Sequence, residues 1–167
     1  MNTAQIIRLR SSHAPELLNA IVQSRELHAP WVEPPDSLEA LQEYLNAPED
    51  RYIRFGIRAS DGSLGAVINL NAIVRGAFHS AFLGFYALAP HQRTGLVRLG
   101  LKMVIEESFS RLELHRLEAN IQPDNQRSAA LVKSLGFRLE GHSPRHLKIQ
   151  GSWRDHDRYA LTVEDYE

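Results

Sequence analysis

Apolar residues recur along the chain at two spacings, which separate the predicted helices from the predicted strands. Spacings of three and four, as on one face of a helix, run through residues 13–27, the segment that starts at Ser37, 95–112 and 128–135. Short continuous or alternating apolar runs predict strands between them. These strands are expected at residues 5–9, 52–58, 64–73, 82–88, 116–121, 137–140, 147–149 and 158–162.

Glycine and proline mark the turns between these segments. Residues 61–62 (Asp-Gly) and 150–151 (Gln-Gly) predict hairpin turns, and Gly136 predicts the cap of the last helix. The segment 28–36 holds three prolines and is expected to be a loop. The order of elements predicts a single mixed α/β (α+β) domain over residues 1–167, in which the first two helices form a flap over a cleft.

The segment between Phe82 and the third helix has the form of an anion-binding turn. An apolar run ends at Pro90, a short polar turn ending in Gly95 follows, and a helical pattern begins directly after it. The first N–H groups of a helix have no partner inside the helix and point outward at the positive end of its dipole. This order of strand, turn and helix therefore predicts a pyrophosphate site for a nucleotide-type cofactor.

Composition narrows the class of protein. The chain has 167 residues, of which 43% are hydrophobic and 23% charged, as in a globular domain, and its net charge of −1 argues against a protein that coats nucleic acid. It has no cysteine, which excludes disulfides and a cysteine nucleophile. The eight histidines form no converging set, so no metal is expected. Residues 1–10 lack a signal-peptide core and no apolar run reaches the ~20 residues of a membrane helix, so a cytoplasmic protein is expected.

Residues 92–97, Gln-Arg-Thr-Gly-Leu-Val, resemble the phosphate-binding loop of the GNAT superfamily of acyl-CoA-dependent N-acetyltransferases. That family's later pattern, Asn-x-x-Ser before a short helix ending in Leu-Gly-Phe, is matched by Asn125, Ser128 and residues 135–137. The resemblance implies a GNAT fold, with a mixed, mostly antiparallel sheet split into a V and flanked by helices. It also implies acetyl-CoA as co-substrate and direct attack of an amine on its thioester.

Within this superfamily the chain is most similar to the ribosomal-protein-alanine N-acetyltransferases. The similar segments include 114–125 (Leu-His-Arg-Leu-Glu-Ala-Asn-Ile-Gln-Pro-Asp-Asn), 151–156 (Gly-Ser-Trp-Arg-Asp-His), 159–161 (Tyr-Ala-Leu) and 28–31 (His-Ala-Pro-Trp). The resemblance implies that the acceptor is the N-terminal amine of a protein, specifically an alanine of a ribosomal protein.

Two residues of the loop depart from the family pattern. Val97 stands where Gly or Ala is usual, and Arg93 stands where this branch often has Gly. A missing glycine restricts the backbone geometry that cradles a phosphate. The Arg93 side chain offsets this restriction if it pairs with a phosphate oxygen.

The resemblance assigns the cofactor to two backbone segments and one side chain. The N–H groups of the loop cradle the phosphates, and N–H groups at a bulge before Pro90 hold the oxyanion. Asn125 positions the cofactor. The competing interpretations are an ordinary strand-to-helix turn and simple helix capping. The expected cofactor-binding residues are Ala87, Leu88, Ala89, Gln92, Arg93, Thr94, Gly95, Leu96, Val97, Arg98, Asn125 and Ser128.

Two side chains are expected to move protons. Ser128 is the candidate acid for the leaving thiolate, since a hydroxyl within hydrogen-bond reach is the minimum requirement. Many relatives use a tyrosine in this helix, but the corresponding position here holds Val132. Glu118 is the candidate base for the amine proton, since related N-terminal acetyltransferases carry a Glu in this strand. The alternatives are that Ser128 only caps its helix and that Glu118 pairs with Arg116 or Arg138.

Trp31 and Asp155 are the candidate acceptor-binding residues. In this interpretation Asp155 binds the incoming ammonium and Trp31 closes over it. The alternatives are a structural Arg–Asp pair beside a packed Trp153, and a Trp31 that only anchors its own loop.

Two other functions stay open at this point. The acceptor of an acetyltransferase can instead be a polyamine, an amino sugar or an antibiotic, and a non-catalytic acyl-CoA-binding module is a different class again. Monomer and homodimer are both compatible with the sequence. A polyamine site requires clustered carboxylates in the flap, for which the sequence offers Glu33, Asp36, Glu39 and Glu43.

Overall fold

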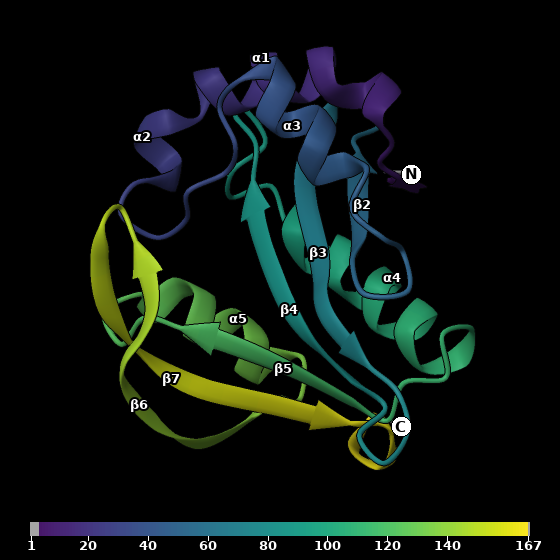
Figure 1. The fold of residues 1–167 in the computed structure, drawn as a ribbon, viewed down its shortest axis with the longest axis vertical. Helices are drawn as coiled ribbons and strands as arrows, with labels where there is room; N and C mark the ends of the chain where they lie inside the picture. The colour runs from purple at the N-terminus through teal and green to yellow at the C-terminus, as the bar shows by residue number, and fades with distance from the viewer. Residues whose placement is uncertain (1–3, 167) are drawn as a thin grey trace.

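The computed structural model describes residues 4–166, which contain one seven-stranded sheet (Figure 1). The strand order is β1-β2-β3-β4-β5-β7-β6, and all neighbours are antiparallel except β4 and β5. This arrangement confirms the predicted mixed, mostly antiparallel sheet. The strands are β1 (Gln5–Arg8), β2 (Ile53–Arg58), β3 (Leu64–Val74), β4 (Ser80–Ala87), β5 (Arg116–Ile121), β6 (Arg138–Ile149) and β7 (Ser152–Thr162).

Helices flank the sheet on both sides (Figure 1). Leu17 of α1 and Leu41 of α3 pack against Val67 of β3 in one apolar cluster. Leu101 of α4 and Val132 of α5 belong to a second, larger cluster on the other face of the sheet. Helices α1, α2 and α3 are together called the flap below. The helices are α1 (Ala14–Gln23), α2 (Arg25–His28), α3 (Leu38–Leu45), α4 (Leu96–Ser110) and α5 (Gln126–Ser134).

Strands β4 and β5 separate along their length and split the sheet into the expected V (Figure 1). They pair only where Ser80–Phe82 lies beside Arg116–Glu118, a region called the closed end below. Beyond it, β4 continues to Ala87 and β5 to Ile121 without pairing with each other. This second region is the open end.

Residues 13–27 do not form the single helix predicted for them. α1 ends at Gln23, and α2 follows a break at Ser24. The Ser24 hydroxyl donates to Ala20 O at 2.7 Å and accepts the Ala89 N–H at 2.9 Å. This buried side chain therefore competes with regular helix bonding and joins the flap to the loop after β4.

The last two strands are longer than predicted. Residues 138–140 and 147–149 belong to one strand, β6, whose register shifts on both sides of Pro144. A proline is tolerated there because β6 is an edge strand. Strand β7 begins at Ser152 rather than at residue 158. Its charged first half lacks an apolar alternation, which hid the strand in the sequence.

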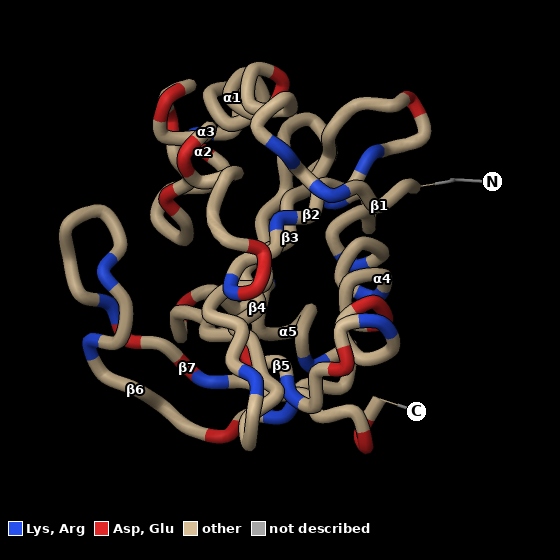
Figure 2. Tube along the Cα trace, turned by 45° about the vertical axis from the view of Figure 1, so that its right-hand side comes forward, with Lys and Arg blue, Asp and Glu red and all other residues tan. Residues whose placement is uncertain are grey.

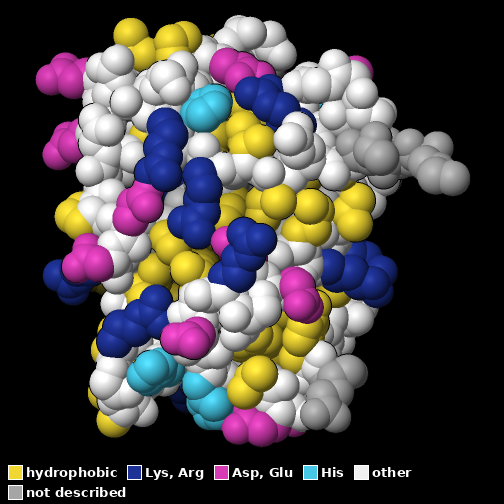
Figure 3. Space-filling view, turned by 90° about the vertical axis from the view of Figure 1, so that its right-hand side faces the viewer, with side chains coloured by type: hydrophobic (Ala, Val, Ile, Leu, Met, Phe, Trp, Pro, Cys, Tyr) yellow, Lys and Arg dark blue, Asp and Glu magenta, His cyan; other side chains and the backbone are white. Residues whose placement is uncertain are grey.

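The surface beside α4 carries charges of both signs, with Lys and Arg side chains interspersed among Asp and Glu (Figure 3). Arg8 of β1 pairs with Glu107 of α4 at 3.3 Å, for example. Within residues 4–166, no helix combines the length and apolar character needed to cross a bilayer.

Candidate active site

A cavity of about 700 Å³ lies at the open end of the V. Its walls come from β4, β5 and β7, from the first turns of α4 and α5, and from the flap. Segments far apart in the sequence thus converge on one concave surface, which has the size of a small-molecule site.

The N–H groups at the end of β4 are divided between two sides of the strand. Leu88 N–H donates to Gly65 O and Ala89 N–H donates to Ser24 Oγ, both at 2.9 Å, so the protein already uses these two predicted oxyanion donors. Neighbouring strand residues present their backbone groups to opposite sides. The Ala87 N–H therefore faces the gap between the arms, and Ala87 lines the cavity.

The bulge expected before Pro90 is absent from the described part of the chain. β4 stays in register with β3 from Phe82 to Ala87, and the recorded shift lies near the hairpin, between Asn71 and Val74. β4 and β5, which belong to the two arms of the V, therefore diverge without an inserted residue at the end of β4.

The loop before α4 leaves backbone N–H groups available to a ligand. α4 starts at Leu96, and its first internal bond joins Leu99 N–H to Gly95 O at 3.0 Å. The N–H groups of Leu96, Val97 and Arg98 therefore have no partner inside the helix. The first turn carries no acidic residue and no side-chain cap, so nothing in it competes with an anion.

Positive φ angles shape this loop. Gly95 has φ 83° and Arg93 has φ 64°, in the left-handed region that favours glycine. Arg93 thus adopts the conformation expected of the glycine it replaces, at a cost of about 1 kcal/mol. Gln92 also lines the cavity. Thr94 does not line it, and its hydroxyl donates to His91 O at 2.7 Å.

The charge along the cavity fits a phosphorylated cofactor. Arg93, Arg98 and Arg127 line it, and Asp124 is the one carboxylate in its lining among the described residues. Guanidinium groups beside a helix N-terminus favour phosphate. No three His, Asp or Glu side chains within residues 4–166 are arranged to hold a metal ion.

Asn125 and Ser128 begin α5 and line the cavity. Asn125 Oδ1 accepts the Ser128 N–H at 3.2 Å, which caps the helix. The cap uses the backbone of Ser128 and leaves its hydroxyl outside this bond. Capping and a role in the cavity are therefore compatible for both residues.

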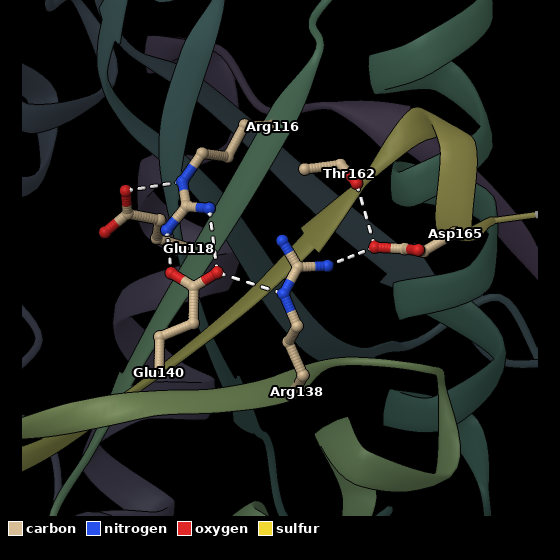
Figure 4. A network of polar contacts seen from close by, with 6 residues as sticks. All are labelled: Arg116, Glu118, Arg138, Glu140, Thr162 and Asp165. Carbon is tan, nitrogen blue, oxygen red and sulfur yellow. Dashed lines mark hydrogen bonds and ion pairs between the residues drawn. The ribbon is translucent and has the colours of Figure 1, made fainter.

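Glu118 lies at the closed end in a network of ion pairs (Figure 4). Arg116 donates to Glu118 at 2.8 Å and to Glu140 at 3.1 Å, and Arg138 also donates to Glu140 at 3.0 Å. Arg138 further contacts Asp165. The hydrogen bond from Arg116 is the main reason that the pKa of Glu140 lies below its ordinary value.

This position argues against the predicted role of Glu118 as base. The cavity is lined by Asn120 and Gln122, which share a face of β5 with Glu118, but not by Glu118 itself. The ion pair with Arg116 holds Glu118 at the closed end, two residues before Asn120. The geometry matches the alternative interpretation, an ion-paired carboxylate.

Trp31 lines the cavity from the loop after α2, as expected of an acceptor-binding residue. Two bonds tie this loop to the opposite arm of the V. Gln122 Nε2 donates to Pro30 O at 3.2 Å, and Gln150 N–H donates to Glu33 Oε2 at 3.0 Å. The loop thus bridges the open end above the cavity.

Asp155 does not line the cavity. It accepts the Arg145 N–H at 2.8 Å and lies 3.4 Å from His142 Nε2, so its bonds are structural. The alternative of an Arg–Asp pair beside a packed tryptophan is also wrong in detail, because Trp153 is 61% exposed.

Several cavity residues were missed in the sequence, and three of them carry polar side chains that matter below. His28 ends α2 rather than lying in a loop, His156 lies on β7, and Asn120 precedes the end of β5. All three line the cavity, and burial lowers the pKa of both histidines. The period of two along β5 identifies Asn120 once Glu118 is placed, but His156 required knowing that β7 extends back past Arg158.

The sequence and the fold both have known relatives. Residues 5–138 match the family described as acetyltransferase (GNAT) domain. A probable N-acetyltransferase of Bacillus subtilis is 35% identical over 75% of this chain and 69% of the relative. The ribosomal protein uS5-alanine N-acetyltransferase of Escherichia coli is 39% identical over 60% of this chain, a match that spans only 52% of that enzyme. The spermidine N(1)-acetyltransferase of Vibrio cholerae is 24% identical over 99% of this chain and 97% of its own.

Two solved structures share the fold over nearly the whole chain. The ribosomal-protein-S5-alanine acetyltransferase of Vibrio fischeri has a TM-score of 0.87 at 23% identity, covering 100% of this chain and 99% of its own. Mycobacterium smegmatis RimJ in complex with CoA-disulfide has a TM-score of 0.87 at 26% identity, covering 96% and 82%.

Proposed function

The chain belongs to the GNAT family of acyl-CoA-dependent N-acetyltransferases, and we propose that its acceptor is the N-terminal α-amine of a protein. Family membership confirms the predicted enzyme class, fold and use of acetyl-CoA, and it disfavours the non-catalytic module. The acceptor we infer is a ribosomal protein that starts with alanine, supported by the match to the uS5-alanine enzyme. With a ribosomal acceptor, the proposed reaction takes place in the cytoplasm. In this proposal the chain acts as a single catalytic domain.

The observation that carries this proposal is a group of side chains without a fixed charge in the cavity lining, beside which we place the acceptor. They are Trp31, His28, Asn120 and His156. A free α-amine has a pKa of about 8, well below the roughly 10.4 of a lysine amine, and so loses its proton without a carboxylate beside it. A polyamine carries several lasting positive charges, which need several carboxylates, whereas Asp124 is the one carboxylate in the cavity lining among the described residues.

The four carboxylates considered for a polyamine site lie on α3 and on the loop before it, a part of the chain where Figure 2 marks acidic positions. None of Glu33, Asp36, Glu39 and Glu43 lines the cavity. Asp36 lies 3.7 Å from Arg25, and Glu33 accepts a backbone N–H of the β6–β7 turn. This placement favours the peptide over the polyamine.

We assign separate roles in the reaction to the remaining cavity residues. Acetyl-CoA supplies the acetyl group as a thioester. In the proposal, the first N–H groups of α4 with Arg93 and Arg98 hold its phosphates, and Asn125 positions it. The Ala87 N–H donates to the oxyanion, and the Ser128 hydroxyl protonates the leaving thiolate.

The test is release of free thiol from acetyl-CoA, read with a thiol reagent. A chain without cysteine adds no thiol background. The acceptors are an Ala-starting ribosomal-type peptide, the same peptide with a blocked N-terminus, Ser- and Met-starting peptides, spermidine and an amino sugar. We expect turnover on the free Ala peptide and none on its blocked form. Turnover on spermidine or the amino sugar alone would contradict the peptide acceptor and keep the enzyme class.

A further inference from the structure

Strand β7 carries into the cavity a buried histidine without a predicted role. His156 is 3% exposed and lines the cavity. Asn120 of β5 pairs with Arg158 of β7, and residues two apart on a strand share a face, so His156 and Asn120 lie on the same side of the sheet. We propose that His156 is the general base that takes the proton of the acceptor amine. This assignment rests on the proposed function.

The backbone fixes the tautomer of His156. Its Nδ1 lies 2.9 Å from the carbonyl oxygen of Arg154. A carbonyl only accepts hydrogen bonds, so Nδ1 carries the hydrogen and donates it. In a neutral imidazole the other nitrogen then has a free lone pair. Nε2, at the tip of the side chain, is therefore the proton acceptor.

The surroundings of His156 keep its ring neutral. Burial is the main cause that lowers its pKa, and His146 of β6, with its ring centre 6.0 Å away, lowers it further. The backbone hydrogen bond and the carboxylates of Asp155 and Asp157 raise the pKa, but both carboxylates are already engaged with His142. A pKa below that of an ordinary histidine leaves Nε2 unprotonated at neutral pH.

Asn120 gives the acceptor amine a second contact. Its Oδ1 is buried and has no hydrogen-bond partner within the described residues. A buried oxygen without a partner is unfavourable, and such atoms usually receive a ligand or a water. An ammonium donates hydrogen bonds to Asn120 Oδ1 and to His156 Nε2. Neither group carries a negative charge that would hold the amine in its protonated form.

The reaction balances with His156 as the first proton acceptor. The ammonium gives one proton to Nε2, and the freed lone pair of the amine nitrogen forms a C–N bond with the acetyl carbon as the C–S bond breaks. The amide keeps one N–H hydrogen. The third hydrogen passes as a proton to the Ser128 oxygen while the Ser128 hydroxyl gives its own proton to the leaving thiolate, and the His156 imidazolium returns its proton to solvent.

His28, also buried in the cavity wall, is placed for a different task. Its Nε2 lies 2.7 Å from Ala87 O, so this nitrogen carries the hydrogen and donates it. Its Nδ1 is the ring nitrogen nearer its own helix backbone. The ring packs edge-on against Tyr86, with centres 4.8 Å apart. His28 therefore positions the flap on β4.

The test replaces His156 with glutamine, which keeps a polar side chain but cannot take the proton. At saturating acetyl-CoA and Ala peptide we expect His156→Gln to lower kcat about 100-fold or more. Calorimetry should show unchanged CoA binding. The rise of kcat with pH, which in the unaltered enzyme follows a pKa below 6.5, should disappear. The control is His115→Gln, an exposed histidine paired with Glu164 at 2.9 Å, for which kcat should not change.

Two further readouts separate catalysis from a structural effect. Added imidazole should restore turnover of His156→Ala, which a purely structural residue would not allow. NMR of the unaltered chain should show Nε2 of His156 as the unprotonated ring nitrogen at neutral pH, with a pKa below that of an ordinary histidine. A His156 that carries its hydrogen on Nε2 at neutral pH would overturn the proposal even if the variants fail to fold.

The outcomes also separate this proposal from the proposed function. An unchanged kcat in His156→Gln, with the unaltered enzyme active on the peptide, would overturn the base role alone. Loss of the pH dependence in His28→Gln instead would move the role to His28. An unaltered enzyme without turnover on any amine would overturn both proposals.

Discussion

The two ends of β5 differ in how their polar groups are satisfied, although they share one face of one strand. At the closed end, Arg116 and Glu118 belong to a network in which each charge has a partner of opposite sign (Figure 4). At the open end, within the described residues, the buried Oδ1 of Asn120 has no hydrogen-bond partner, and because Nδ1 of His156 is the donor, its Nε2 keeps a lone pair.

This contrast indicates that the reaction takes place at the open end. Charges that pair with each other within the protein stabilise the junction of the two arms. Because they are already paired, they are not available to bind a substrate. A buried polar atom without a partner is unfavourable unless a ligand completes it. The cavity lies at the open end, where Asn120 Oδ1 and His156 Nε2 are available for hydrogen bonds. We therefore expect the substrate to form those bonds.

Among the other residues of the open end, we expect the largest loss of activity from replacing Ser128. Ser128→Ala removes the proposed acid and should lower kcat about 100-fold, while the backbone N–H that Asn125 caps remains in place. The matched control is Ser134→Ala in the same helix, whose hydroxyl donates to Leu131 O. Steady-state thiol release gives kcat for both variants. Equal kcat values for the two would contradict a role of Ser128 in the mechanism.

Gly95→Val tests the loop that holds the cofactor. A branched side chain at φ 83° destabilises the turn by about 1–2 kcal/mol, and the displaced N–H groups should weaken CoA binding by about 10-fold. Gly62→Val is the control, because Gly62 has φ 85° and open space around it but lies in a hairpin turn outside the cavity. Calorimetric CoA binding should fall only for Gly95→Val, and a similar fall in both variants would mean that stability alone is measured.

Much of this architecture could be predicted because it follows from local patterns. The periods of apolar residues identified most strands and helices, and Gly95 marked the start of α4. The division of β5 into two ends could not be predicted. It depends on where β4 stops pairing, on the reach of Arg116 across to Glu140, and on a strand β7 whose charged start shows no alternation.

At the closed end the expected effect is on stability. The lowered pKa of Glu140 means that its ion pair with Arg116 stabilises the fold above pH 4.5, and that this stabilisation is lost as pH falls through the folded pKa. Arg116→Gln should therefore lower the free energy of unfolding by about 1 kcal/mol at neutral pH and by less under acidic conditions.

Urea unfolding at neutral and at acidic pH measures how much free energy of unfolding the Arg116→Gln variant loses under each condition. The control is Arg111→Gln, whose side chain is 79% exposed and 3.7 Å from Glu107, and which should change stability by less than about 0.5 kcal/mol. An Arg116 effect that grows as the pH falls would contradict the ion-pair account.

The most direct test of the contrast between the two ends is kcat for Glu118→Gln at saturating acetyl-CoA and Ala peptide. Glu118 is ion-paired at the closed end and does not line the cavity, so kcat should stay within about threefold of the unaltered enzyme. A folded Glu118→Gln protein that binds CoA but has lost about 100-fold or more of its kcat would place the base at the closed end and contradict this account.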